Sequence, residues 1–222
     1  MSLALAFAVG SAVALSVSPA RVALVAPASR TLELRNTGAE RLVVDVTGKS
    51  VDGRRSTGWL TLRPAQVSLA AGASARLMLR AGTSRSEPGD HEVLLLLSAR
   101  PARAGGVAVR VRLGVRVRVR MPGRIVRHVT LNGLRVSRHR DGRYLLVSLT
   151  NLGNVAEQLR GQLSVTLVRN GRVVSLLRPP RPRELWPGTR AVVALRYRGR
   201  VRGPVTAVVK MRGKERRYRL RL

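Results

Sequence analysis

Arginine is the residue type in this sequence with the clearest capacity for chemistry. The 222 residues include 42 Lys and Arg against 11 Asp and Glu, which gives a formal net charge of +31. Guanidinium groups bind phosphates and carboxylates through paired hydrogen bonds. The excess therefore favours an anionic partner such as nucleic acid, a wall polymer, a lipid headgroup or an acidic protein. Codon bias in a GC-rich genome explains the same excess, so charge alone names no partner.

The arginines alternate with small apolar residues in three stretches. The longest stretch, Gly106–Arg120, reads GVAVRVRLGVRVRVR, and one side of its strand would carry Arg110, Arg112, Arg116, Arg118 and Arg120. The second set is Arg196, Arg198, Arg200 and Arg202, and the third is Arg217, Arg219 and Arg221. Same-face neighbours on a strand lie about 6–7 Å apart, so each set would form a ladder that could hold an anionic polymer. The alternative is a solvated strand face, on which basic residues also block edge-to-edge aggregation.

Strict period-two alternation in Gly106–Arg120 predicts an extended strand, because a helical repeat would scatter the valines around the axis. A straight strand of this length would run about 45 Å, which is long for a globular protein. Gly114 is therefore the expected bulge or bend. Its valine face must pack on another layer, which predicts a β-sandwich.

Motifs of common enzymes are absent from the sequence. There is no G-x-S-x-G elbow, H-E-x-x-H pair, P-loop or G-x-G-x-x-G, and there is no cysteine. His91, His128 and His139 are expected to be ordinary surface or strand residues rather than metal ligands. Asp90 and Glu92 are expected to counter nearby arginines, and Trp59 and Trp186 to be buried anchors. We expect neither an enzyme nor a cofactor.

The first residues, MSLALAFAVGSAVAL, are apolar, uncharged and too short to span a bilayer comfortably. Ala12-Val13-Ala14 has the form of a signal-peptidase site, which predicts a signal peptide over residues 1–14. The absence of Lys and Arg before the apolar run is unusual for a signal, and a buried core segment is the alternative. No later apolar run is long enough to span a membrane, so we expect a secreted or cell-envelope protein without a membrane anchor after cleavage.

Short strands separated by turns follow. The first set is Arg21–Val25, Arg30–Asn36, Arg41–Gly48, Trp59–Leu62, Val67–Leu69, Ala75–Arg80 and His91–Ala99, followed by the arginine strand. Met121-Pro122-Gly123 would be a linker, so the prediction is all-β, with immunoglobulin-like sandwiches over residues 15–121 and 122–222. Type I′ hairpin turns are expected at Asp141-Gly142 and Asn170-Gly171, and a weaker turn at Asn132-Gly133. The last strands are Val192–Arg198, Val205–Met211 and Arg216–Leu222.

The two halves repeat each other. A strand ends at Asn36-Thr37-Gly38 in the first half and at Asn151-Leu152-Gly153 in the second. Later strands are preceded by Leu69-Ala70-Ala71-Gly72 and by Leu185-Trp186-Pro187-Gly188. Glu87-Pro88-Gly89 and Arg202-Gly203-Pro204 then precede the next strands, in the same order. The repetition predicts tandem domains of similar topology.

The segments LSVSPARVAL, LELRNTG, TLRPAQVSLAAGASARLMLR and EPGDHEVLLLLSARP, with the Val/Arg strand, resemble the first domain of periplasmic pilus chaperones. The resemblance implies that this strand pairs with a pilin subunit, and that two basic residues hold the C-terminal carboxylate of the pilin. Arg21 matches the first of them, and the second would be Arg116 or Arg118. The expected partner-binding residues are Arg21, Arg110, Arg112, Arg116, Val117, Arg118, Val119 and Arg120.

The second half, with NLGN and LWPGT, is also similar to Gram-positive surface proteins that interact with WxL-domain proteins and peptidoglycan. Two hypotheses follow. The first is a non-enzymatic protein that binds a pilus or cell-surface protein by strand addition along an open edge of the arginine strand. The second is an envelope module that binds an anionic polymer, teichoic-acid-like, peptidoglycan or nucleic acid, through its ladders. Nucleic acid is the least favoured partner, because aromatic residues for stacking and a recognition helix are lacking.

Overall fold

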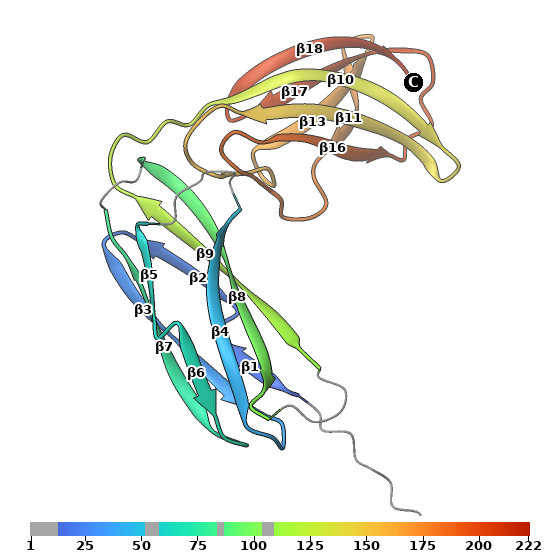
Figure 1. The fold of residues 1–222 in the computed structure, drawn as a ribbon. Coiled ribbons are helices and arrows are strands. Elements are labelled where there is room, and N and C mark those ends of the chain that lie inside the picture. Colours follow the sequence, from blue (N-terminus) through green and yellow to red (C-terminus); the bar gives the residue numbers. More distant parts are fainter. Residues whose placement is uncertain (1–12, 52–57, 84–86, 104–108) are drawn as a thin grey trace, which may run out of the picture. The chain divides into compact units, whose positions relative to one another are not determined.

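The computed structural model describes residues 13–51, 58–83, 87–103 and 109–222. Every regular element in these ranges is a strand, and the strands form two compact units (Figure 1). The first unit runs to Pro122, and the second is Gly123–Leu222. The all-β prediction is confirmed. The described residues include no helix with the length and apolarity that crossing a membrane requires. The predicted signal peptide lies outside the described residues except for Val13 and Ala14.

The first unit is a sandwich of two sheets. The smaller sheet has the order β1-β3-β7-β5, with β1 (Leu15–Ser18), β3 (Ala28–Asn36), β7 (Ser74–Ala81) and β5 (Leu60–Arg63). The larger sheet has the order β2-β9-β8-β4-β6, with β2 (Arg21–Val25), β9 (Val111–Met121), β8 (Gly89–Pro101), β4 (Leu42–Ser50) and β6 (Gln66–Leu69). Alternate residues of both sheets, such as Leu32, Leu79 and Leu97, are wholly buried between them. Among the strands of the first unit, β1 is the one that was not predicted from the sequence.

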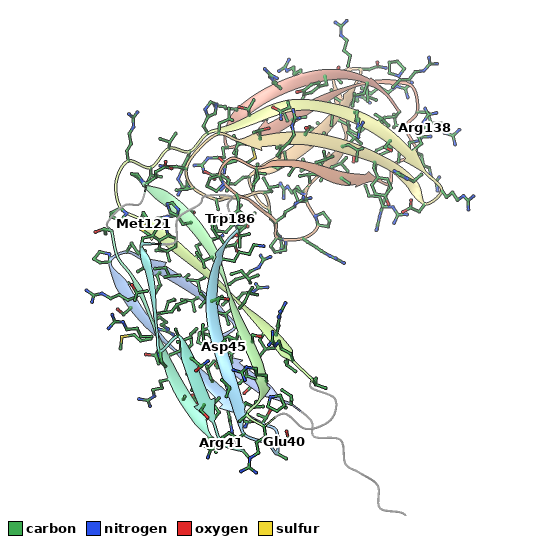
Figure 2. The ribbon with its side chains drawn as sticks, viewed as in Figure 1. Glu40, Arg41, Asp45, Met121, Arg138 and Trp186 are labelled. Atoms are coloured by element: carbon green, nitrogen blue, oxygen red, sulfur yellow. The ribbon has the colours of Figure 1, made fainter. Side chains whose placement is uncertain are left out.

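The second unit is also a sandwich. One sheet has the order β14-β13-β17-β18, with β14 (Arg172–Leu177), β13 (Leu163–Arg169), β17 (Pro204–Met211) and β18 (Lys214–Arg221). The other has the order β10-β11-β16, with β10 (Val129–His139), β11 (Gly142–Asn151) and β16 (Arg190–Tyr197). A short pair, β12 (Glu157–Gln158) and β15 (Glu184–Leu185), completes the unit. Trp59 is 5% exposed, as predicted, whereas Trp186 (Figure 2) is only half-buried.

The repeat seen in the sequence corresponds to one hydrogen-bond arrangement made twice. Asn36 and Asn151 are both 0% exposed. The amide of Asn36 donates to the carbonyl of Leu69 at 3.2 Å, and the amide of Asn151 donates to the carbonyl of Leu185 at 2.8 Å. Each amide also donates to the carbonyl four residues ahead, and each side-chain oxygen accepts the N–H two residues ahead. In both units the asparagine thus fastens the end of one strand to the segment before a later strand. Glu40, whose carbonyl accepts from Asn36, is labelled in Figure 2.

The predicted turns have mixed outcomes. Asn170-Gly171 has φ of 49° and 76°, which fits the predicted type I′ turn. The type I′ prediction at Asp141-Gly142 is wrong, because His139 pairs with Gly142 and the turn residues are Arg140 and Asp141, neither with positive φ. The turn predicted at Asn132-Gly133 is a bulge inside β10 instead. A bulge leaves only one residue of the strand unpaired, and Asn-Gly occurs at both bulges and turns, so this dipeptide does not distinguish the two in sequence.

Candidate partner-binding strand

Strand β9 pairs with β8 along its whole length, but a second neighbour covers only part of it. The antiparallel register with β8 runs from Ala99↔Val111 to Gly89↔Met121 without a shift. On its other side, β2 pairs in parallel with residues 116–120. No described strand pairs with that side of residues 111–115. We call residues 111–115 the free half of β9 and residues 116–120 the covered half.

The predicted open edge is therefore wrong for the covered half, whereas the free half has β8 as its one partner among the described strands. Residues 106–108 of the predicted strand lie outside the described residues. The bulge predicted at Gly114 is also wrong, because the register with β8 is unbroken there. A Cβ at Gly114 would lie 3.1 Å from Cδ1 of Leu94. A side chain at position 114 would therefore require a small shift of the Leu94 side chain on the neighbouring strand.

The apolar side of β9 changes character along the strand. Val115, Val117 and Val119 are 0% exposed and belong to the core of the first unit. The side chains of Val111 and Leu113 are half-buried, and Val109 is 49% exposed. Val117 and Val119, which the sequence analysis named as partner-binding residues, are therefore core residues. The more exposed apolar side chains are therefore those at the start of the strand and Val109 just before it.

The parallel register with β2 distinguishes Arg116 from Arg118. Arg21 lies directly opposite Arg116, whereas Arg118 lies opposite Ala23. Residues opposite each other in paired strands share a face of the sheet, and both Arg21 and Arg116 are exposed. The structure therefore places Arg21 and Arg116 side by side, at the point where β2 begins to cover β9.

Two acids of β8 lie beside the arginines of the covered half. The side chain of Arg120 donates two hydrogen bonds to the carboxylate of Asp90, at 2.8 and 2.9 Å, and Asp90 is 1% exposed. Glu92 is also buried, and its Oε1 lies 3.7 Å from Nη1 of Arg116. The prediction that these acids counter arginines is confirmed. Arg120 is held in a structural ion pair, so it is no longer a candidate for partner binding.

The free half presents arginines on its polar side. Arg112 is exposed on the same side of the strand as Arg116, and Arg110, which directly precedes the strand, is also exposed, whereas Arg118 is half-buried opposite Glu92. Of the arginines that the sequence predicts to bind a partner, the exposed ones are thus Arg21, Arg110, Arg112 and Arg116.

The two ladders predicted in the second unit differ. Strand β16 ends at Tyr197, so only Arg196 of its predicted ladder lies in a strand, and Arg198, Arg200 and Arg202 lie in the connection to β17. That connection folds back, and the N–H of Val201 donates to the hydroxyl of Tyr197 at 3.1 Å. The ladder of Arg217, Arg219 and Arg221 is formed on β18, an edge strand, and all three are exposed.

The three histidines are not grouped with other potential metal ligands among the described residues. His91 is 3% exposed, its Nε2 lies 2.7 Å from the carbonyl oxygen of Glu87, and its ring lies 5.5 Å from that of Trp59. His128 and His139 are exposed. Within the described ranges, no three His, Cys, Asp or Glu residues lie close enough together to hold a metal ion.

No protein-family model and no curated protein sequence matches this chain. Solved structures of similar fold do exist. The class 5 fimbriae chaperone CfaA is 15% identical, with 94% of this chain and 98% of that chain covered and a TM-score of 0.54. The YadV chaperone is 18% identical, with 94% and 99% covered and a TM-score of 0.50. A chain of the Salmonella enterica complex of the SafA pilin with the SafB chaperone is 14% identical, with 95% and 97% covered and a TM-score of 0.50.

These likenesses extend over nearly the whole chain and both of its units. The structures concerned are chaperones rather than enzymes, and nothing among the comparisons supports the resemblance to WxL-interacting proteins. The chain has the two-domain, immunoglobulin-like fold of periplasmic pilus chaperones.

Proposed function

We propose that this protein is a periplasmic chaperone that binds a pilus subunit by adding a strand of the subunit to the free half of β9. The observation that carries the proposal is the division of β9, in which β2 covers residues 116–120 and leaves residues 111–115 with one neighbour among the described strands. The unpaired N–H and C=O groups of an edge strand are a template for another chain. The complex of the SafA pilin with the SafB chaperone supports the choice of partner class.

The apolar side chains of the free half fit this role. In strand addition, backbone hydrogen bonds supply affinity, and alternate side chains enter pockets of the partner. Val111 and Leu113 lie on the same side of the strand, and both are half-buried. A subunit with an incomplete sandwich would cover both side chains, because its own core would accept them.

Arg21 and Arg116 supply an anchor for the end of the added strand. Two exposed guanidinium groups from neighbouring strands suit a carboxylate, which accepts paired hydrogen bonds from them. We assign this pair to the C-terminal carboxylate of the subunit. Arg112 in the free half and Arg110 just before it are also exposed and would orient an acidic surface of the subunit.

Hydrogen exchange of the free protein tests the division of β9. In the covered half, the amides of Val117 and Val119 should both be strongly protected, because strands pair with both sides of β9 there. In the free half, the amides that point away from β8 should exchange fast, so protection should alternate along the strand. Strong protection at every amide of the free half would contradict an open edge.

Binding is tested by coexpression with a pilin subunit from the same genome. Arg21→Ala and Arg116→Ala should each weaken the complex about tenfold or more, because a hydrogen bond to a charged group contributes about 1.5–3 kcal/mol. Leu113→Asp should also weaken it, since a charge would enter an apolar pocket. Arg35→Ala, on the outer face of the other sheet, is the matched control. If Arg21→Ala and Arg116→Ala bound as well as the control, the carboxylate anchor would be wrong. If no pilin formed a complex, the proposed function would fail.

A further inference from the structure

The outer face of the sheet β14-β13-β17-β18 combines exposed aliphatic side chains with a column of arginines. Two rows cross the sheet at neighbouring levels. One row is Leu176, Thr166, Val208 and Arg217, and the other is Val173, Val168, Thr206 and Arg219. Val173 is 65% exposed and Leu176 is 50% exposed. We call these two rows, with Lys210 and Arg221, the outer face. Strands β13, β17 and β18 can be followed in Figure 1.

The orientation of β18 is fixed by its inner side chains. Arg216 donates from Nη1 to the carbonyl oxygen of Leu131 on β10 at 2.8 Å, and Tyr218 and Leu220 pack against the core. Alternation along the strand then directs Arg217, Arg219 and Arg221 away from the core. These arginines are therefore held in a column by the fold, beside an apolar surface.

Acidic groups on the outer face are few. Glu215 is the one acid of β18, and its carboxylate lies 3.4 Å from Lys210 and 3.1 Å from Arg217. Arg169 and Arg172 flank the turn next to Val173, and both are exposed. The aliphatic residues are thus bordered by cations along β18 and at the β13–β14 turn. Exposed apolar surface with a polar rim is typical of protein or membrane interaction sites.

We propose that the outer face binds the surface of a bilayer that contains anionic phospholipids. A lipid surface offers phosphates in one plane and acyl chains beneath them, so the arginines and the aliphatic side chains can be satisfied together. Nucleic acid and wall polymers offer the phosphates or carboxylates without an apolar layer for Val173 and Leu176. The aromatic ring on β18, Tyr218, packs toward the core rather than onto this face, so base stacking has no platform there. The proposal does not depend on the pilin-binding role of β9.

Vesicle flotation tests the proposal on the full chain. The probe is phosphatidylcholine vesicles with and without phosphatidylglycerol. The protein should bind the vesicles that contain phosphatidylglycerol, and binding should weaken as salt is added. Each cation near an anionic surface contributes roughly a fivefold change in partitioning, so Arg217→Gln/Arg219→Gln/Arg221→Gln should lower it about 100-fold.

A second variant tests the apolar part. Val173→Ser/Leu176→Ser keeps every charge and should lower partitioning by at least about tenfold, because each buried CH₂ contributes about a fourfold factor and more than two carbon atoms are removed. The matched control Arg35→Gln/Arg76→Gln/Arg80→Gln removes the same number of positive charges from the first unit and should lower partitioning far less. Emission of Trp186 establishes that each variant of the second unit is folded.

Three outcomes would overturn the proposal. One is an equal loss in the control triple, which would mean that net charge alone drives binding. Another is unchanged partitioning of Val173→Ser/Leu176→Ser together with equal binding to soluble polyphosphate, which would identify an anionic polymer as the ligand. The third is an absence of binding to the vesicles that contain phosphatidylglycerol.

Discussion

Replacement of the two repeated asparagines should destabilise each unit separately and by similar amounts. Asn151→Ala removes two hydrogen bonds to the carbonyls of Val155 and Leu185, both at 2.8 Å, and one from the N–H of Gly153 at 2.9 Å. Each buried polar group left without a partner costs about 1–3 kcal/mol, so the loss should be about 3–5 kcal/mol. Since domains are stable by about 5–15 kcal/mol, this is a large fraction of the whole. Asn36→Ala should cost the same, because it makes the corresponding bonds.

The chain offers a reporter for each unit, because it has two tryptophans, Trp59 in the first unit and Trp186 in the second. Urea unfolding would be followed by fluorescence on backgrounds in which one tryptophan is replaced by Phe. With a slope of about 1.5 kcal/mol/M, a loss of 3 kcal/mol lowers the midpoint by about 2 M. Asn36→Ala should shift the Trp59 transition alone, and Asn151→Ala the Trp186 transition alone.

Asn132 is the matched control, since its side chain is exposed on β10 and its amide donates only to the hydroxyl of Thr150. Asn132→Ala should cost less than about 1 kcal/mol. A loss of similar size for Asn132→Ala and Asn151→Ala would refute the role given to the buried amide. Movement of both tryptophan transitions by either buried variant would refute independent unfolding of the two units.

Three further predictions concern the second unit. The carboxylate of Glu157 is 1% exposed and forms ion pairs with Arg127, at 3.2 Å, and with Arg212. Arg127→Ala/Arg212→Ala should therefore lower the free energy of unfolding in urea by about 3–5 kcal/mol, because it leaves a buried charge unpaired. This loss should exceed the sum of the losses in the two single variants, since either arginine alone still pairs with Glu157. Gly153→Ala should destabilise strongly in the same assay, because its Cβ would lie 2.3 Å from the carbonyl oxygen of Val126, and tolerance of alanine there would contradict this backbone packing. The pKa of Asp141 is lowered, chiefly by a hydrogen bond from the neighbouring tyrosine hydroxyl, so its stabilising effect should be present at neutral pH and be lost as pH falls through the folded-state pKa. Carboxyl NMR titration measures that pKa, and an unshifted value would contradict the contact.

Local patterns carried most of the fold prediction. Arg21–Val25 was predicted with the bounds that β2 has, and most other strands were predicted to within two residues of their ends. Alternation succeeds here because one face of each strand is buried and the other is solvated. The asparagine repeat was equally visible in sequence. Its cause, a buried amide that binds backbone carbonyls more than 30 residues away, was not.

Sequence reasoning failed where a distant neighbour decides the outcome. Residues 21–25 and 116–120 are about 95 positions apart, so nothing local to the arginine strand shows that β2 covers half of it. The ladder predicted from Arg196 to Arg202 failed for a related reason. The arginines keep alternating after Tyr197, but the backbone turns back over its ring, and a Cβ at Gly199 would lie within 2.6 Å of three ring or hydroxyl atoms. The alternation of residue types along a sequence does not show at which residue a strand stops pairing with its neighbour.

The division of β9 also changes what the repeated Val/Arg pattern means. In the covered half the valines form the core and Arg120 satisfies a buried carboxylate, so substitutions there act on folding. In the free half Val111 and Leu113 are half-buried and Arg112 is exposed, so under the proposed function substitutions of these three would act on partner binding. Arg116 is the first residue of the covered half. It lies opposite Arg21, and its Nη1 is 3.7 Å from Oε1 of Glu92. A carboxylate that binds these arginines would therefore compete with Glu92 for Arg116, whereas Arg21 has no acid opposite it on β9. Arg21 should accordingly contribute the larger share of the anchor.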